Sequence, residues 1–515
     1  MSDTEVPSDT GVSSTVRAPA SRRAALAAGV AAIAMAVLPK RARAQATRRP
    51  RPGPIAGTPN IPNEIPVAPQ EWANDSNRLL RRITYGITDA DVTAAKQYGF
   101  RGFLERQLDY THIDDSAVDA FVAAKYPYIS QGTSQLYNAN SGTVQNQLQQ
   151  ATLYRAAFSK RQLYERMVEF WSDHFNISYS KVTYLKVVDD ADVIRKYALT
   201  TFPKLLYASA KSGAMMVYLD QNQSRSGSPN QNYAREIMEL HTLGVDGGYT
   251  QNDVAELSRV LTGWSIVGRG DFAFYSSIHD FGKKTVLGVT IPASSSSVGA
   301  GAIVEGEQML DMLLAHPSTA SFIATKMLRW FVTPQPTAQQ VAAVAAEYTR
   351  TGGDIRAMIR VALDPAWIAA APMKLKRPFH LIASSMRTTT PTVSGVAGPT
   401  AQLNNTGQQL FMWDTPDGCP DRVDYWAGNV LPRWNYASYY SALAGGEVNL
   451  DVAQFMRGNA ADLTVAAIDT RLFGGEIDPA LRASLTTYLK GGTYNAARVR
   501  ETLALAMSSN TFQWY

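Results

Sequence analysis

The stretch Asn232-Tyr-Ala-Arg-Glu-Ile-Met-Glu-Leu-His-Thr-Leu-Gly244 has the pattern of one amphipathic helix that ends at its glycine. Shortly after it, Thr250 and Asp253 form a T-x-x-D capping box, which predicts the start of another helix that runs to about Thr262. The same helical spacing of apolar residues recurs over most of the chain from Glu71 onward. We therefore expect a mainly α protein, built as a large multi-helix domain.

Other segments extend this pattern, with one exception. Thr88 and Asp91 form a second capping box, for a helix expected to stop near Gly99, and residues 143–178 read as one or two long helices. The exception is the segment 264–304, where apolar and polar residues alternate before a serine-rich run. Alternation of this kind favours strands, so we expect a short β/loop insertion there.

The N-terminal residues 1–44 have the composition of an export signal. Arg22-Arg23 precedes a 15-residue apolar run, Ala24–Leu38, and Ala42-Arg43-Ala44 offers a cleavage site. The arginine pair resembles a twin-arginine signal. Because a membrane-spanning helix needs about 20 residues, we expect no stable membrane span, although an uncleaved anchor is the alternative. The sequence thus predicts an exported protein, periplasmic or secreted.

A proline-rich linker is expected over residues 45–70, because closely spaced prolines remove amide donors and favour extended backbone. No later segment shows a clear boundary, so residues 71–515 are expected to form a single large helical domain.

Charge and cysteine content exclude several classes of protein. The net charge of the chain is +5, but residues 1–44 carry +3 of it, and Arg48, Arg49 and Arg51 lie in the linker. The remaining body is close to neutral, so the sequence does not predict a nucleic-acid-binding surface. Cys419 is the one cysteine, which excludes an intrachain disulfide and a cysteine-rich metal site.

Three histidines and two glutamates are the candidate catalytic residues: His174, His241, His279, Glu236 and Glu239. Imidazole is the usual general base near neutral pH and a common metal ligand. A carboxylate pair one helical turn apart can bind a divalent cation or share a proton. We therefore name Glu236, Glu239 and His174 as candidate ligands of a divalent metal whose identity the sequence does not give.

Helical geometry limits how these residues can combine. In a regular helix His241 would lie about 160° around the axis from Glu239, so the two could not share one ion unless the helix unwound before Gly244. The alternative for the two glutamates is pairing with Arg235 or Arg259. For His174 the alternative is a buried histidine bonded to a carbonyl.

A loop around Gly418 offers a second, less favoured cation site. Asp414, Asp417, Asp421 and Asp424 surround that glycine, but their spacing is not that of an EF-hand. Solvated Asp-Pro and Asp-Gly turns are the favoured reading.

A family resemblance rests on the same motifs. The segments Leu79–Gly86, Glu165–Phe175, Asn232–Thr250, Val254–Trp264 and His279–Gly288, with His316-Pro317, resemble the bacterial family catalogued as domain of unknown function 1800. The likeness extends from about residue 72 to the end of the sequence. It implies a largely helical, exported protein and names a phosphatase- or sulfatase-like protein as a candidate partner, but it implies no activity.

Two positions depart from the family pattern. Ser172 stands where members often have a histidine after the tryptophan, and Asp417-Gly418-Cys419-Pro420 replaces a Gly-Trp-Pro loop. If that histidine were a ligand, this chain would bind metal less well.

Two functions follow as expectations. The first is an exported hydrolase that acts on an extracellular or periplasmic polymer, for which a polysaccharide is the candidate substrate, through the His/Glu site. The second is a non-catalytic exported scaffold that binds a partner enzyme or a surface polymer. Metal content and the convergence of the central histidines on one pocket would distinguish them.

Overall fold

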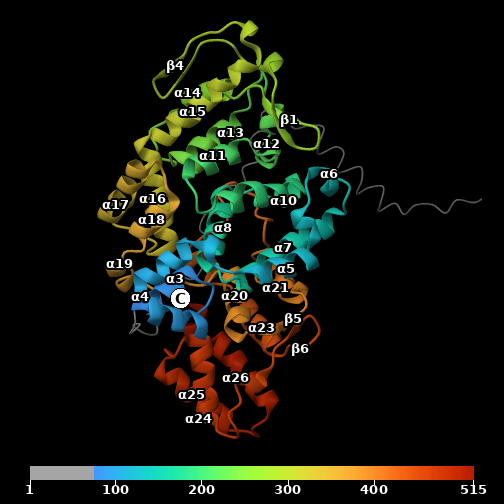
Figure 1. Ribbon diagram of the computed structural model, residues 1–515, viewed down its shortest axis with the longest axis vertical. Coiled ribbons are helices and arrows are strands. Elements are labelled where there is room, and N and C mark those ends of the chain that lie inside the picture. Colours follow the sequence, from blue (N-terminus) through green and yellow to red (C-terminus); the bar gives the residue numbers. More distant parts are fainter. Residues whose placement is uncertain (1–74) are drawn as a thin grey trace, which may run out of the picture. The chain divides into compact units, whose positions relative to one another are not determined.

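The computed structural model describes residues 75–515, and within them the chain is mainly α-helical, as predicted (Figure 1). The predicted export signal and linker lie outside the described residues. The first helices are α3 (Asp75–Ile83), α4 (Asp89–Leu108), α5 (Ser116–Lys125), α6 (Thr133–Leu136), α7 (Ser141–Phe158) and α8 (Gln162–His174). Both capping boxes form, at Thr88 with Asp91 and at Thr250 with Asp253. The predicted stop near Gly99 is confirmed as a break in the helix: Gly99 has φ 68° and ψ 178°, and a second helical stretch follows it within α4.

The middle of the chain alternates short helices with two π-helical segments. These elements are α9 (Tyr179–Val182), α10 (Leu185–Asp189), η3 (Asp190–Arg195), α11 (Phe202–Ala210), α12 (Gly213–Tyr218), α13 (Gln231–Glu236), η5 (Ile237–Thr242) and α14 (Gln251–Val260). The segments η3 and η5 are π-helical. A π turn inserts a residue into the helix and rotates the side chains that follow it.

The β insertion is confirmed as two small antiparallel hairpins. They consist of β1 (Trp264–Val267) with β2 (Asp271–Phe274), and β3 (Lys284–Val286) with β4 (Val289–Ile291). Trp264 pairs with Phe274, and Lys284 pairs with Ile291.

Helices resume after the hairpins. They are α15 (Ile303–Ala315), α16 (Pro317–Phe331), α17 (Ala338–Thr351), α18 (Ile355–Ala362), α19 (Pro365–Ala369), α20 (Pro378–Thr389), α21 (Ala397–Asn405), α22 (Val423–Trp426), α23 (Val430–Ser441), α24 (Ala461–Ile468), α25 (Pro479–Lys490), α26 (Ala496–Ser508) and α27 (Asn510–Gln513), with a third π-helical segment, η9 (Asp469–Phe473). A third small sheet joins β5 (Thr392–Val393), β7 (Val448–Asn449) and β6 (Ala444–Gly445). Among the described residues, no helix combines the length and apolar character that a membrane crossing requires.

Two hydrophobic cores hold these elements. The first takes its side chains from α3, α4, α8 and α11–α18, and the second from α5, α7, α20, α21 and α23–α27. Helix α8 contributes Leu163, Met167 and Trp171 to the first core, all fully buried. Its other face therefore carries the residues that meet the second core.

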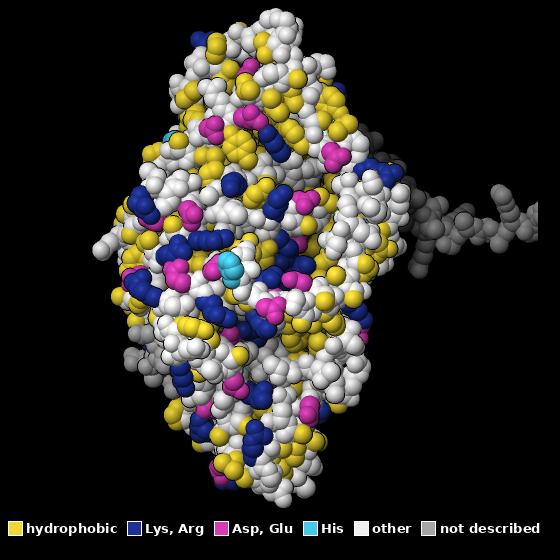
Figure 2. Space-filling view, viewed as in Figure 1, with side chains coloured by type: hydrophobic (Ala, Val, Ile, Leu, Met, Phe, Trp, Pro, Cys, Tyr) yellow, Lys and Arg dark blue, Asp and Glu magenta, His cyan; other side chains and the backbone are white. Residues whose placement is uncertain are grey.

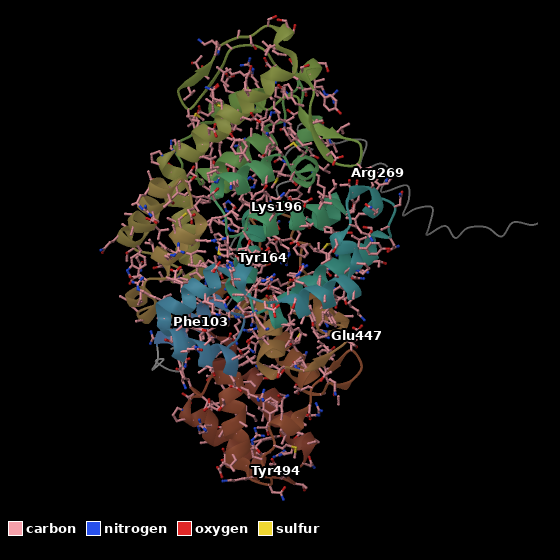
Figure 3. The ribbon with its side chains drawn as sticks, in the orientation of Figure 1. Phe103, Tyr164, Lys196, Arg269, Glu447 and Tyr494 are labelled. Atoms are coloured by element: carbon pink, nitrogen blue, oxygen red, sulfur yellow. The ribbon has the colours of Figure 1, made fainter. Side chains whose placement is uncertain are left out.

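Aromatic polar groups fix α8 against the chain that follows it. The Tyr164 hydroxyl donates to the Arg195 carbonyl over 2.8 Å, and the Trp171 indole donates to the Ala198 carbonyl over 2.9 Å. Tyr164, labelled in Figure 3, also stacks on Tyr110. These bonds hold η3, and with it Arg195, beside α8.

Candidate functional site

Three carboxylates follow one face of α8. Glu165, Glu169 and Asp173 recur every four residues, so their side chains lie one above the other. The helix forms because its opposite face is apolar and buried in the first core. The sequence therefore places three acids at the boundary between the two cores.

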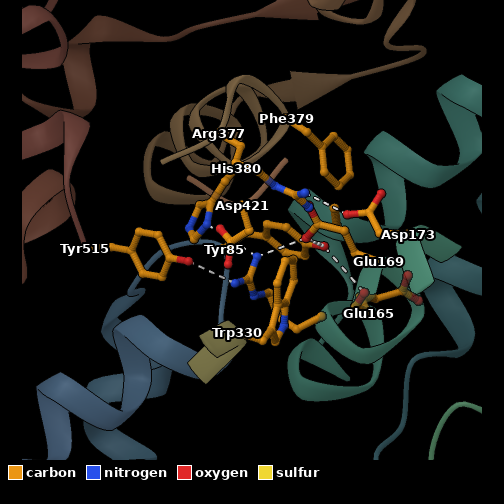
Figure 4. A network of polar contacts seen from close by, with 12 residues as sticks. Tyr85, Glu165, Glu169, Asp173, Trp330, Arg377, Phe379, His380, Asp421 and Tyr515 are labelled. Carbon is orange, nitrogen blue, oxygen red and sulfur yellow. Dashed lines mark hydrogen bonds and ion pairs between the residues drawn. The ribbon is translucent and has the colours of Figure 1, made fainter. Parts of the chain in front are cut away.

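Arginines from three elements bind these carboxylates (Figure 4). Arg195 donates to both oxygens of Glu165, at 3.0 and 3.1 Å. Arg166 donates to Glu169 over 2.9 Å. Arg377, just before α20, binds Glu169 with one guanidinium nitrogen and Asp173 with the other, the latter over 2.6 Å. One buried guanidinium thus joins two carboxylates of the helix.

Tyrosine and tryptophan side chains complete the network. The Tyr85 hydroxyl donates to Glu169 over 2.8 Å, and the Tyr515 hydroxyl accepts from Arg166 over 3.1 Å. The ring of Trp330 lies under both guanidinium groups, 4.4 Å from Arg166 and 4.9 Å from Arg377. Aromatic faces stabilise cations that have left water.

A small cavity of about 50 Å³, which opens to solvent, lies against this network. On the face drawn in Figure 2, charged side chains of both signs crowd around a hollow near the middle of the view. The cavity is lined by the three carboxylates and Arg377, by the aromatic rings of Tyr85, Phe379, Phe411 and Trp413, and by polar groups of Ser172, Asn176, Asp190, Gln408, Gln409 and Cys419. Rings beside a few polar groups are typical of a small-molecule site.

Asp173 is the carboxyl that opens most into this space. Its side chain is 27% exposed, against 8% for Glu169 and 6% for Glu165. Burial raises the pKa of Asp173, and the Glu169 charge adds to that effect, against the opposing effect of Arg377. Asp173 therefore holds a proton at higher pH than an ordinary aspartic acid does, as a general acid requires.

Cys419 and Trp413, from the loop around Gly418, line the cavity. Asn176 donates to the carbonyls of Trp413 and Thr415, at 3.0 and 2.8 Å. Burial raises the pKa of the Cys419 thiol, which keeps it protonated and unsuited to nucleophilic attack.

The aspartates of this loop have separate partners. Asp421 binds Lys374 over 2.6 Å, and Asp424 binds Arg422 over 3.0 Å. Asp414 accepts from Ser178 and Asp417 from Thr415. Asp414, Asp417 and Asp424 lie in exposed positions, as solvated turns would have them, whereas Asp421 is half-buried in its ion pair.

The predicted glutamates lie on another helix. Glu236 ends α13 and Glu239 lies in η5, both half-buried, and Glu239 accepts from the Tyr249 hydroxyl over 3.3 Å. The helix is not regular through His241, since η5 is a π turn in which the Thr242 hydroxyl bonds to the Ile237 carbonyl. His241 lies within this π turn and its side chain is fully buried.

The structure brings His174 and His241 together. Their ring centroids are 6.1 Å apart, and His174 Nε2 lies 3.1 Å from the His241 carbonyl oxygen. Because a carbonyl only accepts, His174 carries its proton on Nε2, which leaves Nδ1 as a buried lone pair. Neither His174 Nδ1 nor His241 Nε2 has a hydrogen-bond partner among the described residues.

His279 belongs to a different network. Its Nδ1 lies 2.7 Å from the Thr262 carbonyl and its Nε2 lies 3.3 Å from Glu305, which also binds Lys284. Across residues 75–515, no three His, Cys, Asp or Glu side chains are grouped closely enough to hold one metal ion.

The two neighbouring histidines predict a loss of stability in acid. Burial lowers the pKa of His241 to about 3 and that of His174 well below its usual value. Below pH 6.5 these two histidines bind protons in the unfolded chain but stay neutral in the folded chain. The free energy of unfolding therefore falls as the pH falls from 6.5. Each such histidine removes about 1.4 kcal/mol per pH unit, or about 2 kcal/mol by pH 5.

Urea unfolding of His241→Gln at pH 7.5, 6.5 and 5.0 should show a shallower pH dependence than the parent protein. The exposed His112 provides the control, because His112→Gln removes a histidine whose side chain stays in water in the folded protein. Equal slopes for all three proteins would contradict the neutral buried state of His241.

Sequence reasoning missed the acids and arginines around the cavity. The signal was present, since Glu165, Glu169 and Asp173 have helical spacing opposite an apolar face. Their partner Arg377 lies 204 residues beyond Asp173 and belongs to no motif.

Comparison with known families agrees with the resemblance drawn from the motifs. A family model described as "Protein of unknown function (DUF1800)" matches residues 78–514. The chain belongs to this family. No curated protein and no solved structure matches it.

Proposed function

We propose that this protein is an exported hydrolase that cleaves an extracellular or periplasmic polymer, with Asp173 as its general acid and a polysaccharide as its substrate class. The observation that carries the proposal is the partly exposed Asp173 carboxyl in the aromatic-lined cavity. The proposed chemistry is thus assigned to Asp173 on α8 instead of Glu236 and Glu239.

The cavity supports a sugar ligand by its composition. Ring faces such as those of Phe411 and Trp413 can pack against the apolar faces of sugar rings, while Gln408 and Asn176 can bond to hydroxyl groups. Two carboxyls flanking a glycosidic bond are the usual groups of its hydrolysis.

The roles of the two carboxyls differ by environment. Asp173 would protonate the leaving oxygen, because burial raises its pKa. Glu169, held by Arg166, Arg377 and Tyr85, would lie beside the developing oxocarbenium ion. Water would then add to the anomeric carbon and return a proton to the Asp173 carboxylate. Arg377 orients both groups.

Asp173→Asn tests the proposal. Purified protein is incubated with a panel of soluble polysaccharides, and new reducing ends are measured. Since general acid catalysis contributes about 10²–10⁴-fold, the variant should lose at least about 100-fold in rate. Asp424→Asn removes an exposed acid beyond the same loop and should keep the parent rate. Equal rates for the parent and Asp173→Asn would overturn the assignment.

A cation bound by Glu236, Glu239 and His174 stays a prediction. Metal analysis of the folded protein and of Glu239→Ala is its direct test.

A scaffold role is the second candidate, favoured by an exposed apolar patch. On α23, Val430, Leu431 and Trp434 are 43%, 65% and 51% exposed, and Leu505 of the contacting helix α26 is 44% exposed. Exposed apolar patches mark surfaces that bind other proteins. A phosphatase- or sulfatase-like partner would then be retained by the parent protein and lost with Leu431→Ser, while Asp173→Asn would bind normally.

A further inference from the structure

Two adjacent aspartates at the junction of α10 and η3 differ in how their oxygens are satisfied. Asp189 accepts from Lys186 over 2.9 Å with one oxygen and from the Ser212 hydroxyl over 2.8 Å with the other. Asp190 accepts from Arg195 Nε over 2.9 Å through Oδ2. Its Oδ1 has no hydrogen-bond partner among the described residues, although Asp190 is only 3% exposed. A buried carboxylate oxygen without a donor costs free energy, which a ligand that donates to it would recover.

The guanidinium that binds Asp190 carries a second unsatisfied atom. Arg195 binds Glu165 through Nη1 and Asp190 through Nε, which leaves Nη2 buried and without a partner in the described part of the chain. One ion pair therefore contains both an unpartnered acceptor and an unpartnered donor. A hydroxyl group both donates and accepts, so a single hydroxyl can satisfy the two atoms. An ammonium group only donates and a carboxylate only accepts, so neither can satisfy both.

Asp190 lines the cavity at its closed end. Among the acids that follow α8, Asp173 is the most exposed, and Glu169 and Glu165 are progressively more buried (Figure 4). The cavity therefore opens beside Asp173 and closes toward Glu165. Because Arg195 binds both Glu165 and Asp190, the unpartnered oxygen of Asp190 belongs to the closed end.

The cavity is too small for a sugar ring but has room for a substituent of one. Its volume is about 50 Å³, whereas one water occupies about 30 Å³ in the liquid, so about two non-hydrogen atoms of a ligand can enter. Ala156, Val168 and Phe379 supply apolar parts of its wall. A hydroxymethyl group has one apolar carbon and one hydroxyl oxygen, and it matches this space in both size and polarity.

We infer that Asp190 is a specificity-determining residue of the site, and that its Oδ1, together with Arg195 Nη2, binds the hydroxymethyl group of a hexose unit in the polymer. The sugar ring stays at the open side of the cavity, and only its substituent enters. This inference rests on the proposed function, and it names hexose polymers as the substrate class. The pentose polymer xylan has no hydroxymethyl group, so it leaves both buried atoms unsatisfied and binds more weakly.

Cleavage of a polysaccharide panel tests this specificity. The panel contains xylan and several soluble hexose polymers (glucans, a mannan and a galactan), and kcat and KM are measured for each polymer that is cleaved. The parent protein should have a kcat/KM at least about 10-fold higher for its best hexose polymer than for xylan. Cleavage of xylan as fast as that of any hexose polymer would overturn the inference.

Asp190→Asn tests the residue directly. Asparagine keeps the size of the side chain and can bind Arg195 through its oxygen, but it then places an N–H group where the free oxygen was. We expect kcat/KM for the hexose polymer to fall about 10–100-fold, mainly through a higher KM, because a hydrogen bond to a charged group is lost. Cleavage of xylan should not change, which a merely structural role would not give. Asp192→Asn, at an exposed position of the same element, is the matched control and should keep the parent values.

Val168→Ile keeps the test decisive if Asp190→Asn folds poorly. Val168 is buried on α8 and lines the cavity, and isoleucine adds one carbon to that wall. The added carbon takes space that the hydroxymethyl group needs, so the hexose polymer should lose its advantage over xylan. A preference for the hexose polymer that neither variant changes would mean that water, and not the substrate, fills the cavity, and the inference would fail.

Binding measurements separate this inference from the hydrolase function. Titration calorimetry with cellohexaose and xylohexaose compares a hexose chain and a pentose chain of equal length and linkage. If no polymer is cleaved, but cellohexaose binds more tightly and Asp190→Asn removes the difference, the hydrolase function fails and recognition by Asp190 stands. If cleavage of a hexose polymer depends on Asp173 but Asp190→Asn matches the parent, the hydrolase function stands and this inference fails. If neither cleavage nor a difference in binding is found, both fail.

Discussion

Replacement of Arg377 by methionine should lower the free energy of unfolding by about 3–5 kcal/mol, which is the usual result of removing one partner from a buried charge network. The Arg377 side chain is 4% exposed and binds both Glu169 and Asp173. Among residues 75–515, Asp173 then keeps no cation in contact, and Glu169 keeps only Arg166 and the Tyr85 hydroxyl. Methionine fills a similar length, so the loss is electrostatic more than steric. Urea unfolding at pH 7 measures it.

The pH dependence of this loss gives a second check. Since a protonated Asp173 no longer needs a cation, the difference in stability between parent and Arg377→Met should shrink in acid. Burial raises the pKa of Asp173, so the difference begins to shrink at a higher pH than for an ordinary aspartate.

Arg350 provides the matched control. It pairs with Glu347 on the surface, with its side chain 70% exposed, so Arg350→Met should leave the free energy of unfolding nearly unchanged. A cost for Arg377→Met as small as this would mean that water or local rearrangement satisfies the two acids.

The sequence predicted helix boundaries well where residues at the helix end determine them. Both capping boxes are read directly from Thr and Asp three residues apart. Gly99 was predicted to stop its helix, and its non-helical backbone does interrupt α4 before a second helical stretch follows. No atom lies within 4 Å of where its Cβ would be, so the chain is free to turn and resume helix.

The candidate site was harder to predict because it depends on pairing between distant segments. The sequence left open whether the helix stays regular through His241, and a π turn at η5 interrupts it there. His174 and His241 did meet, as the hypothesis of a shared site required, but His279 is bonded to Glu305 instead. The arginines that face α8 come from η3 and from just before α20, and nothing in the local sequence of α8 indicates them.

Gly418→Ala should be the most damaging small substitution in the loop that borders the cavity. Gly418 has φ +79°, and a Cβ there would lie 2.2 Å from the carbonyl oxygen of Asp173 and 2.9 Å from its carbonyl carbon. These atoms are backbone at the end of α8, so they cannot rotate away. Backbone strain of about 1–2 kcal/mol adds to overpacking of about 1–3 kcal/mol. We expect a loss of about 2–5 kcal/mol in urea unfolding.

Alanine substitutions at two other glycines separate the cost of backbone strain from the cost of the close contact. Gly458 has φ +57° with open space around it, so Gly458→Ala should show the strain alone. Gly428 is open and has no positive φ, so Gly428→Ala should be nearly neutral. If the close approach to Asp173 matters, Gly418→Ala must lower the free energy of unfolding by more than Gly458→Ala does. The displaced loop must also make Cys419 react faster with a thiol reagent. Equal unfolding free energies and equal Cys419 reaction rates for Gly418→Ala and Gly458→Ala would show that α8 and the loop are not packed as closely as the structure requires. In that case the loop would not bury Asp173.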